Sequence, residues 1–142
     1  MDTPLPDAAE LSRLLHDAFP QAFNTAGGFE IIDAGPMGAR MRLPFHERHL
    51  RPGETVSGPA MFGLADCALY VAVLATVGWA PLAVTTNMTL NFLSRPAKRD
   101  MIADCRLLRV GRTLAVGEVS LRSEGSDTVV AHATGTYALP KR

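Results

Sequence analysis

The chain has 142 residues, 47% of them hydrophobic, which is enough for a real core in one domain, residues 1–142, and leaves no room for a second. Its 14 basic and 14 acidic residues give a formal net charge of zero, which argues against broad binding to nucleic acid or to a membrane surface. Cys67 and Cys105 show neither metal-ligand spacing nor a disulfide framework, so we expect both to be reduced and buried. Because residues 1–7 are also acidic and broken by proline, unlike a secretory signal, we expect a cytoplasmic protein.

The first 25 residues are predicted to form a helical segment on the domain surface. Between residues 8 and 19, one helical face carries the apolar side chains of Leu11, Leu14, Leu15, Ala18 and Phe19. Pro20 should end this helix. Residues 29–35 and 39–45 then read as two short strands, the second alternating apolar with basic residues. The turn residues Pro36 to Gly38 join them into a hairpin.

A polar loop over residues 46–54 follows the hairpin. Its two histidines, His46 and His49, could suggest a metal site, but no third ligand stands nearby in the sequence. Solvated loop residues explain them better, and we expect no metal and no cofactor. A binding role for the loop itself remains open, since binding residues often lie on loops held by a rigid scaffold.

Residues 57–77 are predicted to form the central helix. Ser57 can cap its first turn, and Pro59 suits a position where a missing N–H costs nothing. The rest is apolar on every face, as expected of a helix buried on all sides. The apolar run over residues 67–84 is long enough to raise the question of a membrane span, but Asp66 adjoins it and Gly78 and Pro81 interrupt it. A buried helix followed by a strand is therefore the prediction.

Asp66 is the only charged residue between Glu54 and Arg95. A lone carboxylate in such a helix costs several kcal/mol unless it is paired, hydrogen-bonded or protonated. It is either a catalytic carboxylate that lines a cleft, or a structural aspartate satisfied by backbone donors or by water at a subunit seam. These residues alone favour neither interpretation.

The strand predicted over residues 82–93 alternates between two faces. We expect the core face to carry Val84, Thr86, Met88, Leu90 and Phe92. The other face would be a polar row that suits a wet cleft or a strand seam between subunits, made of Thr85, Asn87, Thr89 and Asn91. A turn with three basic residues follows over residues 94–100.

Residues 101–110, 114–123 and 128–139 read as three further strands separated by short turns. Short turns force antiparallel pairing, and one sheet can bury one apolar helix most economically by curling around it. The sequence therefore predicts an α+β domain, a curved antiparallel sheet wrapped around one long central helix, with an additional N-terminal helix. Its sheet edges would pair readily between subunits, so we expect at least a dimer.

Three segments in this order are similar to one family. They are Ser57 to Asp66 at the start of the central helix, Thr85 to Phe92 followed by Arg95-Pro96-Ala97, and the turn Val110-Gly111-Arg112-Thr113. Together they resemble the PaaI-type (phenylacetate-pathway) branch of the hotdog-fold acyl-CoA thioesterases, over roughly residues 40–137. The second segment has one apparent extra residue before its proline.

The resemblance implies hydrolysis of acyl-CoA thioesters in a cleft between two subunits of a homodimer or homotetramer. Asp66 would be the general base or the nucleophile, and the Gly58 N–H at the helix start would polarise the thioester carbonyl. Thr85 matches a position whose hydroxyl helps to hold the water or the carboxylate, with Thr86 as the alternative if the register differs by one. An ordinary strand threonine and a glycine required at the start of the helix are the competing explanations.

Substrate-binding candidates follow from the same resemblance. Ser57 stands where the family has its helix-start histidine. Met61, Phe62 and Tyr70 could line an acyl pocket or belong to the core. The phosphates of CoA call for basic contacts, and we expect these from turn residues that could reach one edge of the cleft, namely Arg95, Lys98, Arg99 and Arg112.

The chain departs from the family at three positions: Ser57 replaces the histidine, Pro59 replaces the second glycine, and Arg51 stands in place of an asparagine that orients water or the substrate carbonyl. These departures keep a second reading open, a non-catalytic acyl-CoA-binding module of the same fold. A hotdog hydratase or dehydratase is a third, although none of the four histidines falls in the central helix or the following strand. A purely structural dimer would leave Asp66 without a purpose. The sequence does not specify the acyl group or choose between dimer and tetramer.

Overall fold

The computed structural model describes residues 4–141, so residues 1–3 and 142 of the expected domain lie outside the described residues. The chain opens with two short helices, α1 (Ala8–Ala18) and α2 (Pro20–Phe23). Asp7 caps α1 by accepting the Glu10 N–H, and Leu11 and Leu15 are its buried residues. The predicted amphipathic helix is thus confirmed, and Pro20 begins the next helix instead of continuing the first.

Strands β1 (Glu30–Gly35) and β2 (Gly38–Leu43) form the expected antiparallel hairpin. The loop that follows is partly ordered into a 3-10 turn (Glu47–His49) and a small pair of strands, β3 (Leu50–Arg51) and β4 (Thr55–Val56). The central helix α3 spans Gly58–Val77, as predicted. Four strands then complete the fold, β5 (Val84–Phe92), β6 (Met101–Val110), β7 (Leu114–Ser123) and β8 (Val129–Ala138).

The six long strands form one antiparallel sheet in the order β1-β2-β6-β7-β8-β5. Antiparallel pairing was predicted correctly, but consecutive strands are not always neighbours: β6 pairs with β2, and β5 pairs with β8 at the opposite edge. Residues 93–100 make this crossing possible. The N–H groups of Leu93 and Ser94 donate to Val130 O, and the Ala97 N–H donates to Ser123 Oγ. These hydrogen bonds hold the β5–β6 connection against the end of the sheet.

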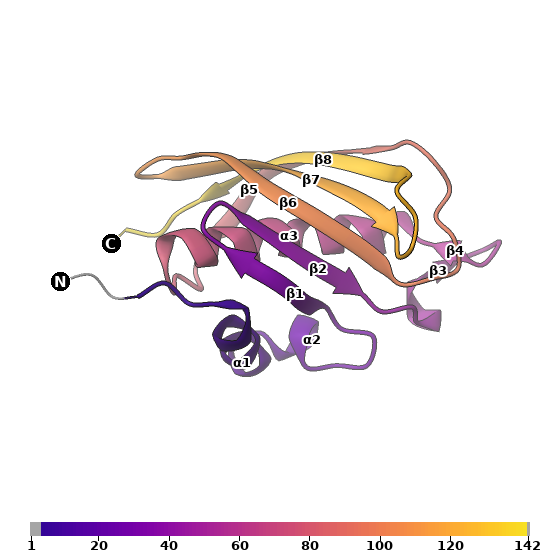
Figure 1. Cartoon of the computed structure of the whole chain (residues 1–142), viewed down its shortest axis with the longest axis horizontal. Helices are drawn as coiled ribbons and strands as arrows, with labels where there is room; N and C mark the ends of the chain where they lie inside the picture. Colours follow the sequence, from indigo (N-terminus) through magenta and orange to yellow (C-terminus); the bar gives the residue numbers. More distant parts are fainter. Residues whose placement is uncertain (1–3, 142) are drawn as a thin grey trace.

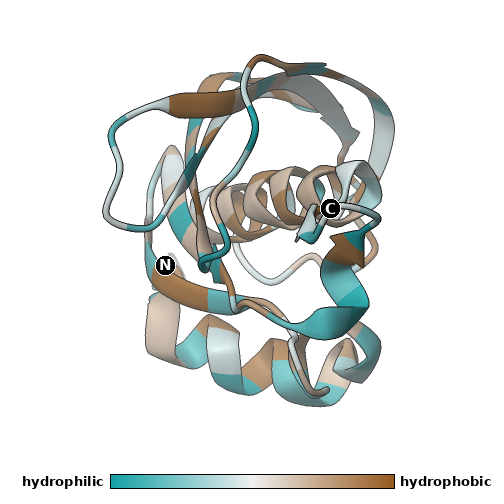
Figure 2. Ribbon diagram, turned by 90° about the vertical axis from the view of Figure 1, so that its right-hand side faces the viewer, coloured by the Kyte–Doolittle hydropathy of each residue, from teal (hydrophilic) through white to brown (hydrophobic). Residues whose placement is uncertain are grey.

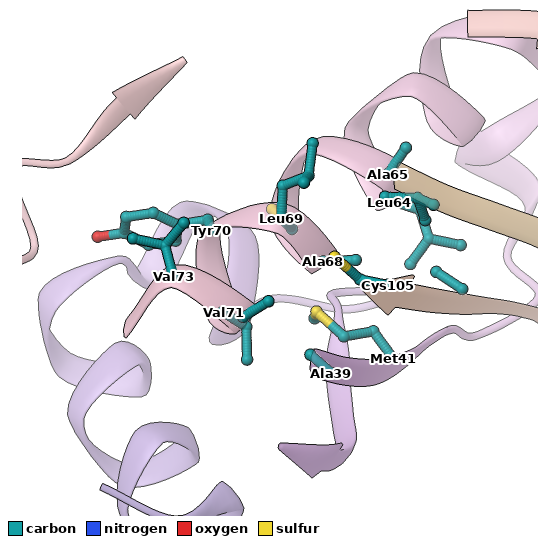
Figure 3. Close-up of a cluster of buried hydrophobic side chains, with 14 of the residues drawn as sticks. Ala39, Met41, Leu64, Ala65, Ala68, Leu69, Tyr70, Val71, Val73 and Cys105 are labelled. Carbon is teal, nitrogen blue, oxygen red and sulfur yellow. The ribbon is translucent and has the colours of Figure 1, made fainter. Parts of the chain in front are cut away.

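The sheet curves around α3, and α1 and α2 lie beside β1 at the open side of the curve (Figure 1). In Figure 2, α1 shows alternating hydrophobic and hydrophilic bands, whereas α3 is enclosed by the sheet. Figure 3 shows side chains of α3 such as Ala68 and Val71 beside Met41 of β2 and Cys105 of β6, all members of one buried core. This arrangement confirms the expected hotdog architecture. Although α3 is long and apolar enough to cross a membrane, it is the buried core helix of this fold.

Two glycines let α3 approach the sheet closely. Gly117 and Gly135 face each other across β7 and β8, and the side chain of Leu69 lies against both. A Cβ atom built on either glycine would stand only 2.7 Å from a methyl carbon of Leu69. Because Asp66 precedes Leu69 by about one helical turn, this close approach also brings Asp66 toward β8.

Candidate functional site

Asp66 lies at a cavity of about 500 Å³ between the N-terminal helices, α3 and the start of β5. Its walls combine aromatic, aliphatic and small residues from these elements: Ala18, Phe19, Ala22, Phe29, Gly63, Cys67, Tyr70, Pro81, Leu82, Ala83, Val84, Thr85 and Tyr137. Asp66 is the only formally charged residue among the described residues that line it. The cavity is therefore a mostly apolar, otherwise uncharged space with a single carboxylate in its wall.

Side-chain hydroxyl groups satisfy this carboxylate. Thr85 Oγ1 donates to Asp66 Oδ1 at 2.6 Å, and the Tyr137 hydroxyl lies 2.6 Å from the same oxygen and 3.0 Å from the Asp66 backbone carbonyl. Distances this short are typical of hydrogen bonds from a hydroxyl to a charged oxygen. The donors to the Asp66 carboxylate among the described residues are thus side chains of β5 and β8.

Tyr137 was not a sequence candidate. It is the pairing partner of Thr85 across β5 and β8, and it is 4% exposed. An inward tyrosine near the end of the last strand was visible in the sequence. Its contact with Asp66 was not, because the two residues are 71 positions apart.

Burial and the neighbouring Asp66 carboxylate raise the pKa of Tyr137, with burial the larger cause. The pKa of Cys67 is raised for the same two reasons, in the same order. For Tyr70, burial raises the pKa, and its hydroxyl donates to Pro81 O at 2.8 Å. These groups stay protonated at neutral pH, so Tyr137 remains a hydrogen-bond donor to Asp66.

A β-bulge between Thr85 and Asn87 explains why the predicted faces of β5 are only partly right. Met88 and Leu90 pack against the core as expected, but the extra residue turns Thr85 inward and leaves Thr86 exposed, with its hydroxyl donating to Thr136 O. A bulge shifts the alternation of side chains by one position, which a strict period of two cannot anticipate. Val84, placed on the core face by the alternation, is 58% exposed.

The start of α3 forms a second, smaller hollow. Ser57 Oγ accepts the Ala60 N–H at 3.2 Å, the predicted helix cap. Among residues 4–141, the structure gives no acceptor for the Gly58 N–H, which leaves this donor available at the positive end of the helix. The Phe92 ring covers Gly58 so closely that a Cβ atom there would lie 3.3 Å from it.

This hollow has a volume of about 290 Å³ and contains Gly58, Met61 and Phe92 together with two arginines, Arg51 and Arg95. It is separate from the Asp66 cavity. Gly58 and Asp66 are eight residues apart along α3, which corresponds to about 12 Å at the helical rise. Within one chain, the two groups therefore do not face the same point.

The structure separates the other substrate-binding candidates. Tyr70 lines the Asp66 cavity, Met61 lines the Gly58 hollow, and Phe62 is 41% exposed and lines neither. Arg95 lies at the end of the sheet near the start of α3, whereas Arg112 lies in the β6–β7 turn at the opposite end (Figure 1). Within one chain, these two arginines therefore lie at opposite ends of the sheet, and their meeting at one edge of a cleft between two subunits stays a prediction.

The histidines lie away from the cavity. His49 Nε2 contacts Gly27 O at 2.8 Å, His46 Nδ1 accepts the Arg48 N–H, and neither residue lines the Asp66 cavity. Throughout residues 4–141, no group of three or more histidine, cysteine or acidic side chains is placed to hold a metal ion.

Comparison with known proteins relates the chain to thioesterases and esterases. Residues 51–138 match the family model of the acyl-CoA thioesterase N-terminal domain. A solved structure named as a thioesterase of Silicibacter sp. TM1040 is 47% identical, with a TM-score of 0.86 over 97% of this chain and 94% of that one. A protein named as an esterase of Halobacterium salinarum is 35% identical over 78% of this chain and 79% of its own length.

The fold is also similar to that of the phenylacetic acid degradation protein PaaI of Thermus thermophilus. That structure has a TM-score of 0.70 and is 24% identical, and the match covers 86% of this chain and 98% of that one. This likeness concerns the fold alone. On the family match, the identities and the shared architecture, this chain belongs to the acyl-CoA thioesterase family with the hotdog fold.

Proposed function

We propose that this protein hydrolyses acyl-CoA thioesters to the free acid and CoA, with Asp66 as the reacting carboxylate. The observation that carries the proposal is the single charged side chain in the wall of an otherwise uncharged, mostly apolar cavity of about 500 Å³. The cavity offers an acyl group apolar surroundings, and the carboxylate offers a base or nucleophile.

Two routes use the same carboxylate. As a general base, Asp66 takes a proton from water, whose oxygen attacks the thioester carbonyl. The C–S bond then breaks, and the proton passes to the departing CoA thiolate. As a nucleophile, Asp66 itself forms the new C–O bond, CoA leaves as the thiolate, and water hydrolyses the resulting anhydride. In both routes, negative charge develops on the carbonyl oxygen and calls for a nearby N–H donor.

The Gly58 N–H of a second copy fits this need. β5 is an edge strand that runs from Thr85, which contacts Asp66, to Phe92, which covers Gly58. If two copies pair antiparallel along β5, the Asp66 end of one strand lies beside the Gly58 end of the other. Exposed apolar residues at this edge, such as Val84 at 58%, Phe92 at 55% and Leu93 at 61%, favour such a contact. A homodimer, or a tetramer built from it, would contain two composite sites.

The walls of the Asp66 cavity favour an uncharged acyl group. No basic side chain lines it among the described residues, so an acyl chain with its own carboxylate would be buried without a partner. Arg51 and Arg95 lie instead in the Gly58 hollow, where they could meet the phosphates of CoA that extends from the partner's side. Arg51 thus adds a positive charge where the family has an orienting amide.

The first experiment is thiol release from a panel of aliphatic and aromatic acyl-CoAs, with the wild type beside Asp66→Ala and Asp66→Asn. Activity lost in both variants, with melting temperature and oligomeric state retained, supports the proposal. Saturable CoA-ester binding without turnover of any substrate would point to a binding module instead. Turnover unchanged in both variants would rule out the proposed role of Asp66.

Mixed dimers test the composite site. Asp66→Asn and Gly58→Pro, which removes the N–H donor, should each be inactive alone. After unfolding and refolding together, half of the dimers combine one copy of each variant, and one of their two sites has both wild-type groups. About a quarter of the wild-type activity should return. If the site lies within one chain, no activity returns.

We also propose that the protein is cytoplasmic and forms one thioesterase-like domain over residues 1–142, with a helical segment over residues 1–25. The two buried cysteines are free, as expected for a reducing compartment. A hydratase or dehydratase is disfavoured because none of the four histidines lines the Asp66 cavity.

A further inference from the structure

The two oxygens of the Asp66 carboxylate have different environments. Both hydroxyl donors, from Thr85 and Tyr137, converge on Oδ1 at 2.6 Å. Oδ2 accepts no hydrogen bond from the described part of the chain, and it is not among the buried side-chain atoms that lack a partner there. It is therefore accessible, and the cavity that Asp66 lines provides the access.

We propose that Tyr137 is a positioning residue which, together with Thr85, fixes Asp66 so that Oδ2 is the reacting oxygen. This inference rests on the proposed hydrolysis. With Oδ1 occupied by two donors, the carboxylate can take the water proton, or attack the thioester carbonyl, only through Oδ2. Tyr137 acts through Asp66 and does not itself touch the reacting atoms.

The fold holds both donors in place. Thr85 and Tyr137 face each other across β5 and β8, and the β-bulge after Thr85 directs its side chain to the same side of the sheet as Met88. The Tyr137 ring stacks on Tyr70 at a centroid distance of 6.0 Å, and the Tyr70 hydroxyl is anchored on Pro81 O at 2.8 Å. Ring stacking and hydrogen bonds thus both keep the Tyr137 hydroxyl directed at Asp66.

Kinetics of Tyr137→Phe separate positioning from general packing. The variant keeps the ring and removes the hydroxyl, so kcat should fall by about ten- to a hundredfold while KM stays within about twofold. Thr85→Val should show the same pattern, because it removes the second donor from the same oxygen. Thr86→Val is the matched control: it removes the hydroxyl of the neighbouring threonine, which donates to Thr136 O and does not contact Asp66, so kcat and KM should both stay within about twofold.

A second readout does not depend on turnover. In ligand-free protein labelled with ¹³C in the aspartate carboxyl groups, the NMR resonance of Asp66 is identified by its absence in Asp66→Asn. It should move in Tyr137→Phe and Thr85→Val and stay in Thr86→Val. An unmoved resonance with unchanged kcat in Tyr137→Phe would overturn the inference, as would an effect on KM alone. Full thiol release by Asp66→Asn would instead defeat the proposed function, and the resonance would still report whether Tyr137 holds the carboxylate.

Discussion

The contact of Leu69 with Gly135 makes the seating of α3 on the sheet testable. An alanine Cβ at position 135 would lie 2.7 Å from Leu69 Cδ1 and 3.3 Å from Asn87 O. An ordinary carbon contact is about 3.5–4.0 Å, so Leu69 must retreat by roughly 1 Å. Leu69 is 1% exposed, so its neighbours in the core resist this shift. Overpacking of this kind lowers the free energy of unfolding by about 1–3 kcal/mol, or about 3–10 °C in melting temperature.

Urea unfolding of Gly135→Ala, Leu69→Ala and the double variant measures this contact. Leu69→Ala alone should cost about 2–5 kcal/mol because it leaves a cavity, but it also makes room for the new methyl group. The double variant should therefore be more stable than the sum of the two losses predicts, by about 1 kcal/mol or more. Gly35→Ala is the matched control: no atom lies within 4 Å of its added Cβ, so it should be neutral or slightly stabilising. Strictly additive losses would refute the argument.

Three further predictions concern the cavity, the helix cap and pH. Phe19→Ala should widen the Asp66 cavity and shift the substrate preference toward longer acyl chains. The gain in kcat/KM should be about fourfold for each additional buried methylene. An unchanged order of substrates would contradict the placement of Phe19 in the cavity wall. Ser57→Ala removes the acceptor of the Ala60 N–H and should lower the free energy of unfolding by about 1 kcal/mol, whereas Ser57→Asn should retain most of it; equal losses in urea unfolding would argue against capping. Burial raises the pKa of Cys105 to about 12, and the pKa of Cys67 is also raised, so both thiols stay protonated in the folded chain while those of the unfolded chain ionise above about pH 8.5. The contribution of the two thiols to the free energy of unfolding is therefore complete below about pH 8.5 and declines by about 1.4 kcal/mol per thiol and pH unit as pH rises toward 12. Cys105→Ala should reduce this slope. A free energy of unfolding independent of pH between 8 and 10 would contradict the prediction.

The local sequence was sufficient for the longer elements, although it did not predict the short helix α2 or the small strands β3 and β4. Apolar spacing, capping residues and prolines located the N-terminal helical segment, the hairpin and the limits of α3, because these signals act between residues close together in the chain. The same reading singled out Asp66, since one charge in an apolar helix stands out without any knowledge of the fold. The contact of Thr85 with Asp66 also agrees with the residue named from the family resemblance, although its role remains a proposal.

Only the tertiary structure decided the strand order and the composition of the cavity. The placement of β2 beside β6 and of β5 beside β8 depends on pairing between distant segments, which turn lengths do not specify. The β-bulge at Thr85 shifts the side-chain alternation by one residue, so a period of two misplaced Val84 and Thr86. Tyr137 contacts Asp66 across 71 positions of sequence, next to the place where Leu69 packs against two glycines on neighbouring strands. The sequence alone thus determined which of the longer elements form and where the unusual charge lies, whereas contacts between distant residues decided what surrounds that charge.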